Sequence, residues 1–136
     1  MKVTGTCHCT HITYEAEVDP SRSGICHCVD CQVLTGSAYR VSIPSMPGTF
    51  RLLTGKPSVY LKTTADSGIP RRHAFCPHCG SPVFAQADED NPPVRTLRVG
   101  GLAQREQLAP KRRIWCQSEL SWSQDIRDIP GIAKQQ

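Results

Sequence analysis

The chain has 136 residues, of which 38% are hydrophobic, 6% are aromatic and eight are cysteine, and its formal net charge is +4. The length is that of one domain, and a mild positive charge that is not gathered in a long run supports a nucleic-acid partner only weakly. No apolar run approaches the roughly 20 residues of a membrane helix, and the start lacks the apolar stretch of roughly 7–15 residues of a signal peptide. We therefore expect a cytoplasmic protein without a membrane partner, whose cysteines indicate metal or redox chemistry rather than disulfides.

Short segments with the two-residue period of a β-strand follow one another along the chain. The clearest is 10–18, in which Ile12, Tyr14, Ala16 and Val18 fall on one face and polar residues on the other. Further strands are predicted, in chain order, over residues 39–43, 50–53, 59–63, 72–75, 82–87, 94–99 and 113–116.

Turns and loops separate these strands. Residues 19–24 and 55–57 have the composition of turns, and 88–93 is an acidic loop with two prolines. Residues 33–35, followed by Gly36, suit a short helical turn that ends at a left-handed glycine.

Nothing in the sequence carries a long helical period, and eleven prolines and ten glycines punctuate the short strands. The pattern therefore predicts a mainly β fold with few short helical turns. We expect a single domain over residues 1–136, with a core over about 4–123 and a C-terminal tail over 124–136.

Seven of the eight cysteines fall in three tight groups. The last group has the form of a zinc knuckle, in which two sulfurs lie on one tight turn and the following Gly80 takes a backbone conformation that other residues resist. The strands on either side of it, 72–75 and 82–87, are candidates for a hairpin. The groups are Cys7 and Cys9; Cys26, Cys28 and Cys31; and Cys76 and Cys79.

A knuckle supplies two of the four ligands of tetrahedral zinc, and Cys7 and Cys9 are one candidate for the other two. In a regular strand these two residues would lie roughly 6.6 Å apart along the strand. Two sulfurs on one ion must come within about 4 Å of each other. We therefore expect a kink or bulge of the backbone at His8.

Two pairs complete one closed site and leave Cys26, Cys28 and Cys31 as a group of three. Three protein ligands with an open fourth position are typical of catalytic zinc, whereas structural sites are closed. This count indicates an enzyme rather than a purely structural metal protein.

Two other interpretations of the cysteines stay open. Cys28 and Cys31 have the spacing of a redox dithiol, although the sequence shows no βαβ unit in which that motif usually begins a helix. Alternatively, all seven cysteines bind structural zinc, with His27, His73 or His78 as an eighth ligand.

The remaining cysteine, Cys116, lies in an apolar stretch and is expected in the core. Trp115 and Trp122 are expected in the core or in the wall of a ligand cleft. We expect three histidines to be solvated or to support the metal ligands, namely His8, His11 and His27.

Several motifs combine into one pattern that spans residues 4–123, nearly the whole chain. They are Gly5-Thr6-Cys7-His8-Cys9, Cys26-His27-Cys28-Val29-Asp30-Cys31, Thr35-Gly36-Ser37-Ala38, Phe75-Cys76-Pro77-His78-Cys79-Gly80, and Ile114-Trp115 with Ser118 and Trp122. This pattern resembles the glutathione-dependent formaldehyde-activating enzyme (GFA) family, whose domain centromere protein V type proteins share. The spacing of all seven cysteines agrees. The chain departs at Thr10, where the family usually has glycine, and at Ser121, where it usually has proline.

The resemblance implies a zinc-bearing β-tent fold of small coiled antiparallel sheets, with two zinc ions per chain. It implies a carbon–sulfur lyase that reversibly joins glutathione and formaldehyde as S-(hydroxymethyl)glutathione. The ligands that it implies are Cys7, Cys9, Cys76 and Cys79 for a structural zinc, and Cys26, Cys28 and Cys31 for a catalytic zinc.

Charged residues near these motifs suggest how a substrate would be held. Asp30 and His27 are candidates for supporting the ligands or carrying protons. An alternative function is a non-enzymatic zinc-binding module for a protein or nucleic-acid partner, which the basic run 111–113 supports weakly. Seven thiolates with two Zn²⁺ would reduce the net charge to about +1, which makes nucleic acid the less favoured partner. The candidates for binding the carboxylates of glutathione are Arg40, Arg71, Arg72, Lys111, Arg112 and Arg113.

Overall fold

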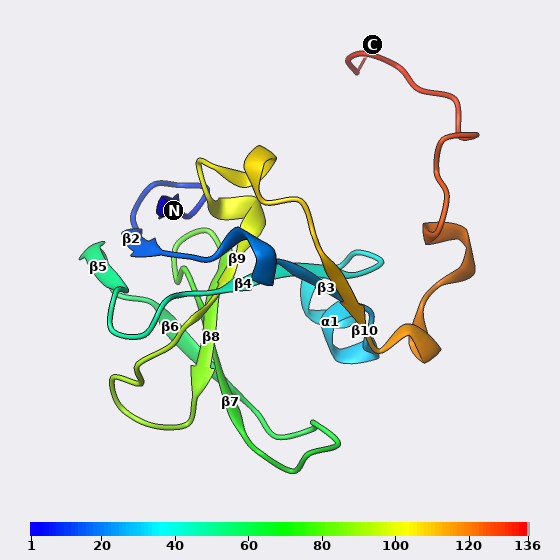
Figure 1. Ribbon diagram of the computed structural model, residues 1–136. Helices are drawn as coiled ribbons and strands as arrows, with labels where there is room; N and C mark the ends of the chain where they lie inside the picture. The colour runs from blue at the N-terminus through cyan, green and yellow to red at the C-terminus, as the bar shows by residue number, and fades with distance from the viewer. Residues whose placement is uncertain (136) are drawn as a thin grey trace.

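The computed structural model describes residues 1–135 and is built mainly of β-strands, which confirms the predicted fold class (Figure 1). A three-stranded antiparallel sheet has the order β1–β2–β5. Its strands are β1 (Lys2–Thr6), β2 (Thr13–Glu17) and β5 (Arg51–Thr54).

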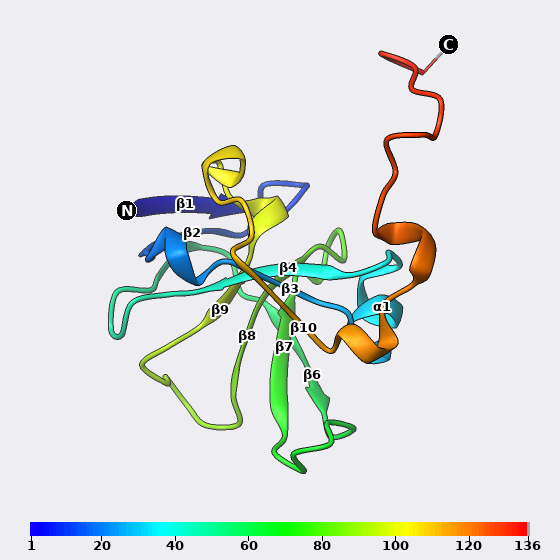
Figure 2. The same cartoon turned by 45° about the vertical axis from the view of Figure 1, so that its right-hand side comes forward.

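A second sheet has seven strands in the order β10–β3–β4–β9–β8–β7–β6. Neighbours run antiparallel, except that β10 lies parallel to β3. The sheet coils strongly, so that β6 and β7 point in a very different direction from β3 and β4 (Figure 2). Its strands are β3 (Gly24–Cys26), β4 (Arg40–Pro44), β6 (Ser58–Lys62), β7 (Arg71–Phe75), β8 (Pro82–Ala87), β9 (Thr96–Arg98) and β10 (Arg112–Ile114).

The core lies between the two sheets. The apolar face predicted for 10–18 is buried, because Ile12, Tyr14, Ala16 and Val18 are each at most 2% exposed. The Tyr14 ring crosses Gly5 so closely that a Cβ on that residue would lie 2.0 Å from the ring. Only glycine fits on β1 at this point.

The predicted strands differ from the observed ones in their partners more than in their bounds. The hairpin of 72–75 and 82–87 is confirmed as β7 and β8. In contrast, the strands on either side of the 55–57 turn belong to different sheets, β5 to the first and β6 to the second. The sequence analysis did not predict β1 or β3.

The single α-helix in the described chain, α1 (Val29–Thr35), begins four residues before the predicted helical turn and ends as expected at Gly36, whose φ is 65°. No helix in residues 1–135 is long and apolar enough to cross a membrane. Beyond Ser123 the chain leads away from the sheets (Figures 1 and 2); Gln136, the last residue of the predicted tail, lies outside the described residues. The 3-10 helices are η1 (Pro20–Arg22), η2 (Val99–Gly101), η3 (Arg105–Gln107), η4 (Cys116–Ser118) and η5 (Ser121–Ser123).

Candidate metal centres and the adjoining cavity

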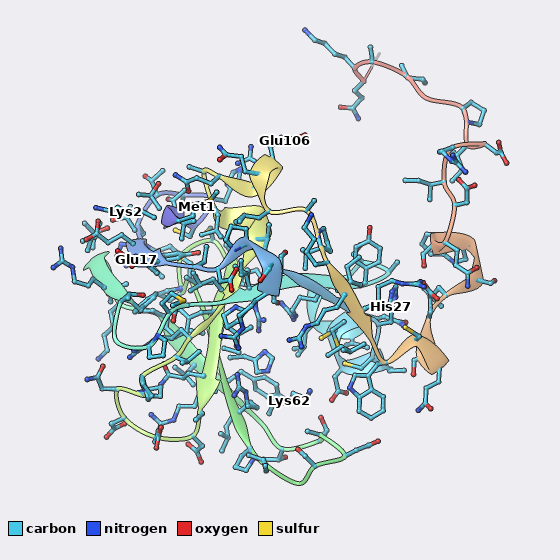
Figure 3. The ribbon with its side chains drawn as sticks, viewed as in Figure 1. Met1, Lys2, Glu17, His27, Lys62 and Glu106 are labelled. Carbon is cyan, nitrogen blue, oxygen red and sulfur yellow. The ribbon has the colours of Figure 1, made fainter. Side chains whose placement is uncertain are left out.

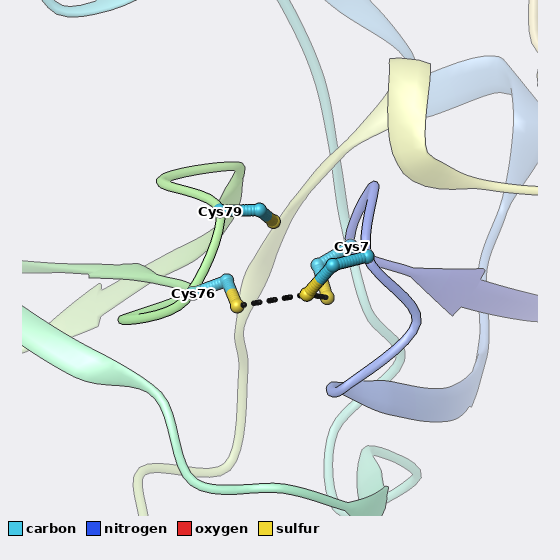
Figure 4. A group of neighbouring side chains, drawn as sticks. Cys7, Cys76 and Cys79 are labelled. Carbon is cyan, nitrogen blue, oxygen red and sulfur yellow. Dashed lines mark hydrogen bonds between the residues drawn. The ribbon is translucent and has the colours of Figure 1, made fainter.

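Four cysteines meet where β1 ends and the β7–β8 hairpin turns (Figure 4). Their sulfur atoms all lie within 4.8 Å of one another, and the Cys9 sulfur is 3.7 Å from those of Cys7 and Cys76. Sulfurs around one zinc ion at about 2.3 Å would be about 3.8 Å apart. The four-sulfur cluster of Cys7, Cys9, Cys76 and Cys79 therefore fits one tetrahedral metal ion.

The bend predicted at His8 is present. The strand ends at Thr6, and a turn follows in which the Thr10 amide donates to the Cys7 carbonyl at 3.1 Å. Thr10 has a φ of 67°, in the left-handed region that β-branched residues rarely adopt. This turn brings two sulfurs of one short segment within bonding distance of a shared ion.

Backbone amides and a hydroxyl point at the sulfurs of this cluster. The Ile12 amide donates to the Cys7 sulfur at 3.2 Å, and the His78 amide to the Cys76 sulfur at 3.4 Å. Hydrogen bonds from Ser81, whose hydroxyl is 3.2 Å from the Cys79 sulfur, lower the pKa of Cys79 to about 5. The turns thus stabilise the thiolate form that binds metal.

The three-sulfur cluster of Cys26, Cys28 and Cys31 forms where β3 ends and α1 begins, again with all sulfurs within 4.8 Å. Cys28 caps the helix by accepting the Cys31 amide at 3.3 Å. A hydrogen bond from Cys26, helped by nearby Arg40, lowers the pKa of Cys31 to about 5. One thiolate is therefore already favoured in this cluster before any metal binds.

The two alternative interpretations of the cysteines can be compared with this geometry. Cys28 and Cys31 do lie at a helix start, as in a redox motif, but the strands before and after α1 are antiparallel, so the unit is not βαβ. None of the three candidate histidines joins either cluster within residues 1–135. His27 instead faces Glu119, His73 faces Arg98, and His78 stacks on His11.

A cavity of about 260 Å³ adjoins the three-sulfur cluster at Cys26 and Cys31, and we call it the cationic cavity. Its walls include residues of β6 and β7 and of β3, β4, β9 and β10, which the coiling of the large sheet brings together (Figure 2). Figure 3 shows His27 beside α1 and Lys62 at the end of β6. The basic side chains in the walls are Arg22, Arg40, Lys62, Arg71, Arg98 and Arg112.

Three of the six predicted carboxylate-binding residues line the cationic cavity, and the other three do not. Arg40, Arg71 and Arg112 line the cationic cavity, whereas Arg72 pairs with two aspartates and Arg113 pairs with Glu119. The sixth, Lys111, is exposed and does not line this cavity.

Three basic residues of the cavity walls were absent from the predicted set, namely Arg22, Lys62 and Arg98, and the most deeply buried of them is Arg98. It lies in β9 between Leu97 and Val99, and all three are buried. A charged residue inside an apolar strand was the available signal, because an arginine is rarely buried without a partner.

The segment after β10 corrects the expectation for Cys116 and the first half of the expectation for Trp122. Cys116 was predicted in the core, but it is exposed in η4. Trp122, at 61% exposure, is not in the core either. The chain leaves β10 at Ile114, and η4 contacts α1, because the Gln32 side chain of the helix donates to the Ser118 carbonyl. This path places Cys116 on the outside.

Trp115 was expected either in the core or in the wall of a ligand cleft. It lines a cleft and is not a core residue. It is 40% exposed and forms part of a cavity of about 410 Å³ beside Cys28 and Asp30. Its φ is 58°, a left-handed conformation that is an outlier for a bulky residue. The three-sulfur cluster therefore has one cavity on the Cys31 side and another on the Cys28 side.

The fold resembles a known crystal structure. A Rhodobacter sphaeroides protein superposes with a TM-score of 0.60 and 21% sequence identity, over 81% of this chain and 98% of that chain. No curated protein compared with the chain matches it. The family model described as glutathione-dependent formaldehyde-activating enzyme matches residues 2–118, which include both cysteine clusters. The chain belongs to this GFA family.

Proposed function

We propose that the protein is a zinc-dependent carbon–sulfur lyase that reversibly joins a thiol, first of all glutathione, to an aldehyde such as formaldehyde. The observation that carries the proposal is a cluster of three cysteines, Cys26, Cys28 and Cys31, beside the cationic cavity. Three protein ligands leave one position of a tetrahedral ion for a substrate. Family membership supports the same chemistry.

The proposed reaction needs no redox partner. In the forming direction the thiol loses its proton, its sulfur forms a bond to the carbonyl carbon, and the carbonyl oxygen takes up a proton. The reverse reaction breaks the carbon–sulfur bond and restores thiol and aldehyde. Zinc at the cluster would lower the pKa of a coordinated thiol and stabilise the leaving sulfur.

His73 and Asp30 are poorly suited to exchange protons with a substrate near pH 7. Burial, together with Arg98 and other cations, lowers the pKa of His73 to about 3, so its ring is neutral near pH 7. Because a guanidinium only donates, His73 Nδ1 accepts from Arg98 at 3.2 Å and its proton lies on Nε2. Thr64 and Lys62 lower the pKa of Asp30, which stays ionised. We infer that protons are exchanged with water.

The four-sulfur cluster is assigned to a structural zinc, which gives two zinc ions per chain. Thiolate ligands suit zinc, and a closed set of four leaves no position for a substrate. Both clusters require reduced cysteines, which fits a reducing compartment such as the cytoplasm.

The non-enzymatic alternative has less support. Of the basic run 111–113, Arg112 lines the cationic cavity and Arg113 donates to Glu119 at 2.6 Å. The run therefore does not present three free cations to a nucleic acid.

The proposal is tested by zinc analysis together with exchange NMR of glutathione and formaldehyde. We expect two zinc ions per chain and faster interconversion of the free thiol and its hydroxymethyl adduct. Cys28→Ser should abolish the acceleration and lower the zinc content, whereas Cys116→Ser, which alters an exposed cysteine outside both clusters, should change neither. Full acceleration by Cys28→Ser, or two ions each held by four protein atoms, would contradict the proposal.

A further inference from the structure

Apart from the cysteines, the charged side chains that line the cationic cavity are all positive. Besides cysteines and His73, every ionisable side chain that lines it is basic, and no carboxylate contributes to it. Lys62 is the exception in having a partner, because its ammonium lies 3.0 Å from Asp30 Oδ2. The other basic side chains face the cavity without an acidic partner in residues 1–135.

Arg71 and Arg98 donate to neutral groups, whereas Arg40 lies beside the Cys31 sulfur, whose pKa it lowers. Arg98 donates to Ser42 Oγ at 3.1 Å, and Arg71 donates to Thr96 Oγ1 at 3.3 Å.

Arg40 and Arg98 are only 5% and 8% exposed. The Nε atoms of both are buried without a hydrogen-bond partner in the described chain. Burying a guanidinium without an anion is costly, so the native state calls for a negative charge here.

The charges can be counted. Three thiolates and one Zn²⁺ have a formal sum of about −1, against the three guanidinium groups that are buried or half-buried. Arg22 and Arg112 also line the cavity, but they are exposed and water screens their charge. A substrate thiolate in the fourth position adds one further negative charge. Balance then requires one more anionic group on the substrate, placed among the three arginines.

We propose that Arg40, Arg71 and Arg98 form an anion subsite that binds an acid group of the thiol substrate, one that carries no neighbouring ammonium. The subsite takes a carboxylate, sulfonate or phosphonate. An ammonium is excluded because no carboxylate lines the cavity to pair with it. On a peptide thiol the acid group is thus a C-terminal carboxylate, and an amino-acid headgroup lies outside this cavity. The inference rests on the proposed function, since it assigns part of the same substrate site.

The test measures thiol binding to the zinc-loaded protein by calorimetry, so it does not depend on turnover. The probes are 3-mercaptopropionate, 2-mercaptoethanol and cysteamine, which carry an acid, a neutral and an ammonium group. We expect the acid thiol to bind about tenfold or more tightly than the neutral one, as for a charged hydrogen bond. The ammonium thiol should bind most weakly.

Arg71→Gln and Arg72→Gln are matched variants, because these neighbours on β7 face different surroundings. Arg71 lines the cavity, whereas Arg72 pairs with Asp88 and Asp90. For each thiol, the affinity of the variant for that thiol is divided by the affinity of the wild type. This ratio removes the effect of the thiol's own pKa, because the same thiol is used in both measurements. Arg71→Gln should weaken only the acid thiol, by about tenfold. Arg71→Lys should restore part of that loss, and Arg72→Gln should change no ratio.

A competition experiment identifies which anion occupies the subsite. Its outcomes also distinguish failure of the anion subsite from failure of the proposed lyase function. Sulfate should compete with 3-mercaptopropionate but not with 2-mercaptoethanol if the subsite binds the substrate's acid group. An acid thiol that binds no tighter than the neutral one, or an acid preference that survives Arg71→Gln, would overturn the subsite while leaving the lyase intact. If no thiol binding depends on Cys28, the lyase proposal fails instead, and with it the assignment of the anion to a substrate.

Discussion

The two cysteine clusters use the same kind of ligand but join very different lengths of chain. The four-sulfur cluster brings the sulfur of Cys9 to 3.7 Å from that of Cys76, which is 67 residues away in the sequence. The three-sulfur cluster lies wholly within 26–31. A link that closes a long loop restricts the unfolded chain more than one that closes a short loop. We therefore expect metal at the four-sulfur cluster to stabilise the fold, and metal at the three-sulfur cluster to contribute little to stability.

The groups that surround the sulfurs also differ between the two clusters. The sulfurs of the four-sulfur cluster receive hydrogen bonds from the amides of Ile12 and His78 and contact the hydroxyl of Ser81. The three-sulfur cluster receives one such bond, from the Cys31 amide to the Cys28 sulfur, and lies against Arg40 and the cationic cavity. Local donors stabilise thiolates in place, whereas an open cavity of cations attracts a further anion. Ligand type alone would not have separated the two roles.

The largest effect should come from Cys76→Ser. Structural zinc can contribute about 10–16 kcal/mol, as much as or more than the whole stability of a domain, about 5–15 kcal/mol. We expect insoluble or unfolded protein, measured by circular dichroism and soluble yield. Cys116→Ser is the matched control and should fold like the wild type. A folded Cys76→Ser protein that melts like Cys28→Ser would remove the distinction between the clusters.

A smaller loss of stability and a complete loss of ligand binding should follow from Cys28→Ser. The ligands of this cluster are local, so the thermal midpoint should stay within about 5 °C of the wild type. Binding of glutathione should disappear, because the metal loses one of three protein ligands. Thermal melts and calorimetry measure the two effects on one sample. If the variant unfolds but binds when folded at low temperature, the cluster is structural.

Chelation should separate the clusters without any mutation. Three protein ligands hold an ion less tightly than four, so a graded chelator titration should remove zinc in two steps. The first step should abolish thiol binding and leave the circular dichroism spectrum unchanged, and the second should unfold the chain. Simultaneous loss of both ions would show that the clusters depend on each other.

Sequence patterns located the parts of the molecule whose determinants are local. The spacing of Cys76 and Cys79 and the alternation from Ile12 to Val18 each depend on a few adjacent residues, and both features are present in the structure. The bend at His8 followed from a simple distance requirement between two sulfurs, and the observed 3.7 Å meets it.

The features that were missed depend on contacts between distant segments. β1 has little apolar character of its own, and its position comes from pairing with β2 and from the close approach of Tyr14 to Gly5. Arg98 is buried because the coiled sheet brings it against His73 of β7; the arginine inside the apolar stretch 94–99 marks an unusual position, but the sequence does not show which strand it faces. The exposure of Cys116 likewise follows from the contact of η4 with α1.

The smallest effect, and one confined to a single cluster, should come from Thr10→Gly. Thr10 holds a φ of 67° in the turn that brings Cys7 and Cys9 together, a conformation that costs a β-branched residue about 1 kcal/mol. Glycine adopts it freely, so the thermal midpoint should rise by about 3–5 °C. The affinity of the four-sulfur cluster for zinc should rise about fivefold, while thiol binding at the three-sulfur cluster stays unchanged. Thr10→Ala is the control, because it removes the hydroxyl and a methyl group but keeps the Cβ that causes the strain. An equal gain in Thr10→Ala would attribute the effect to the side chain rather than to the backbone of this turn.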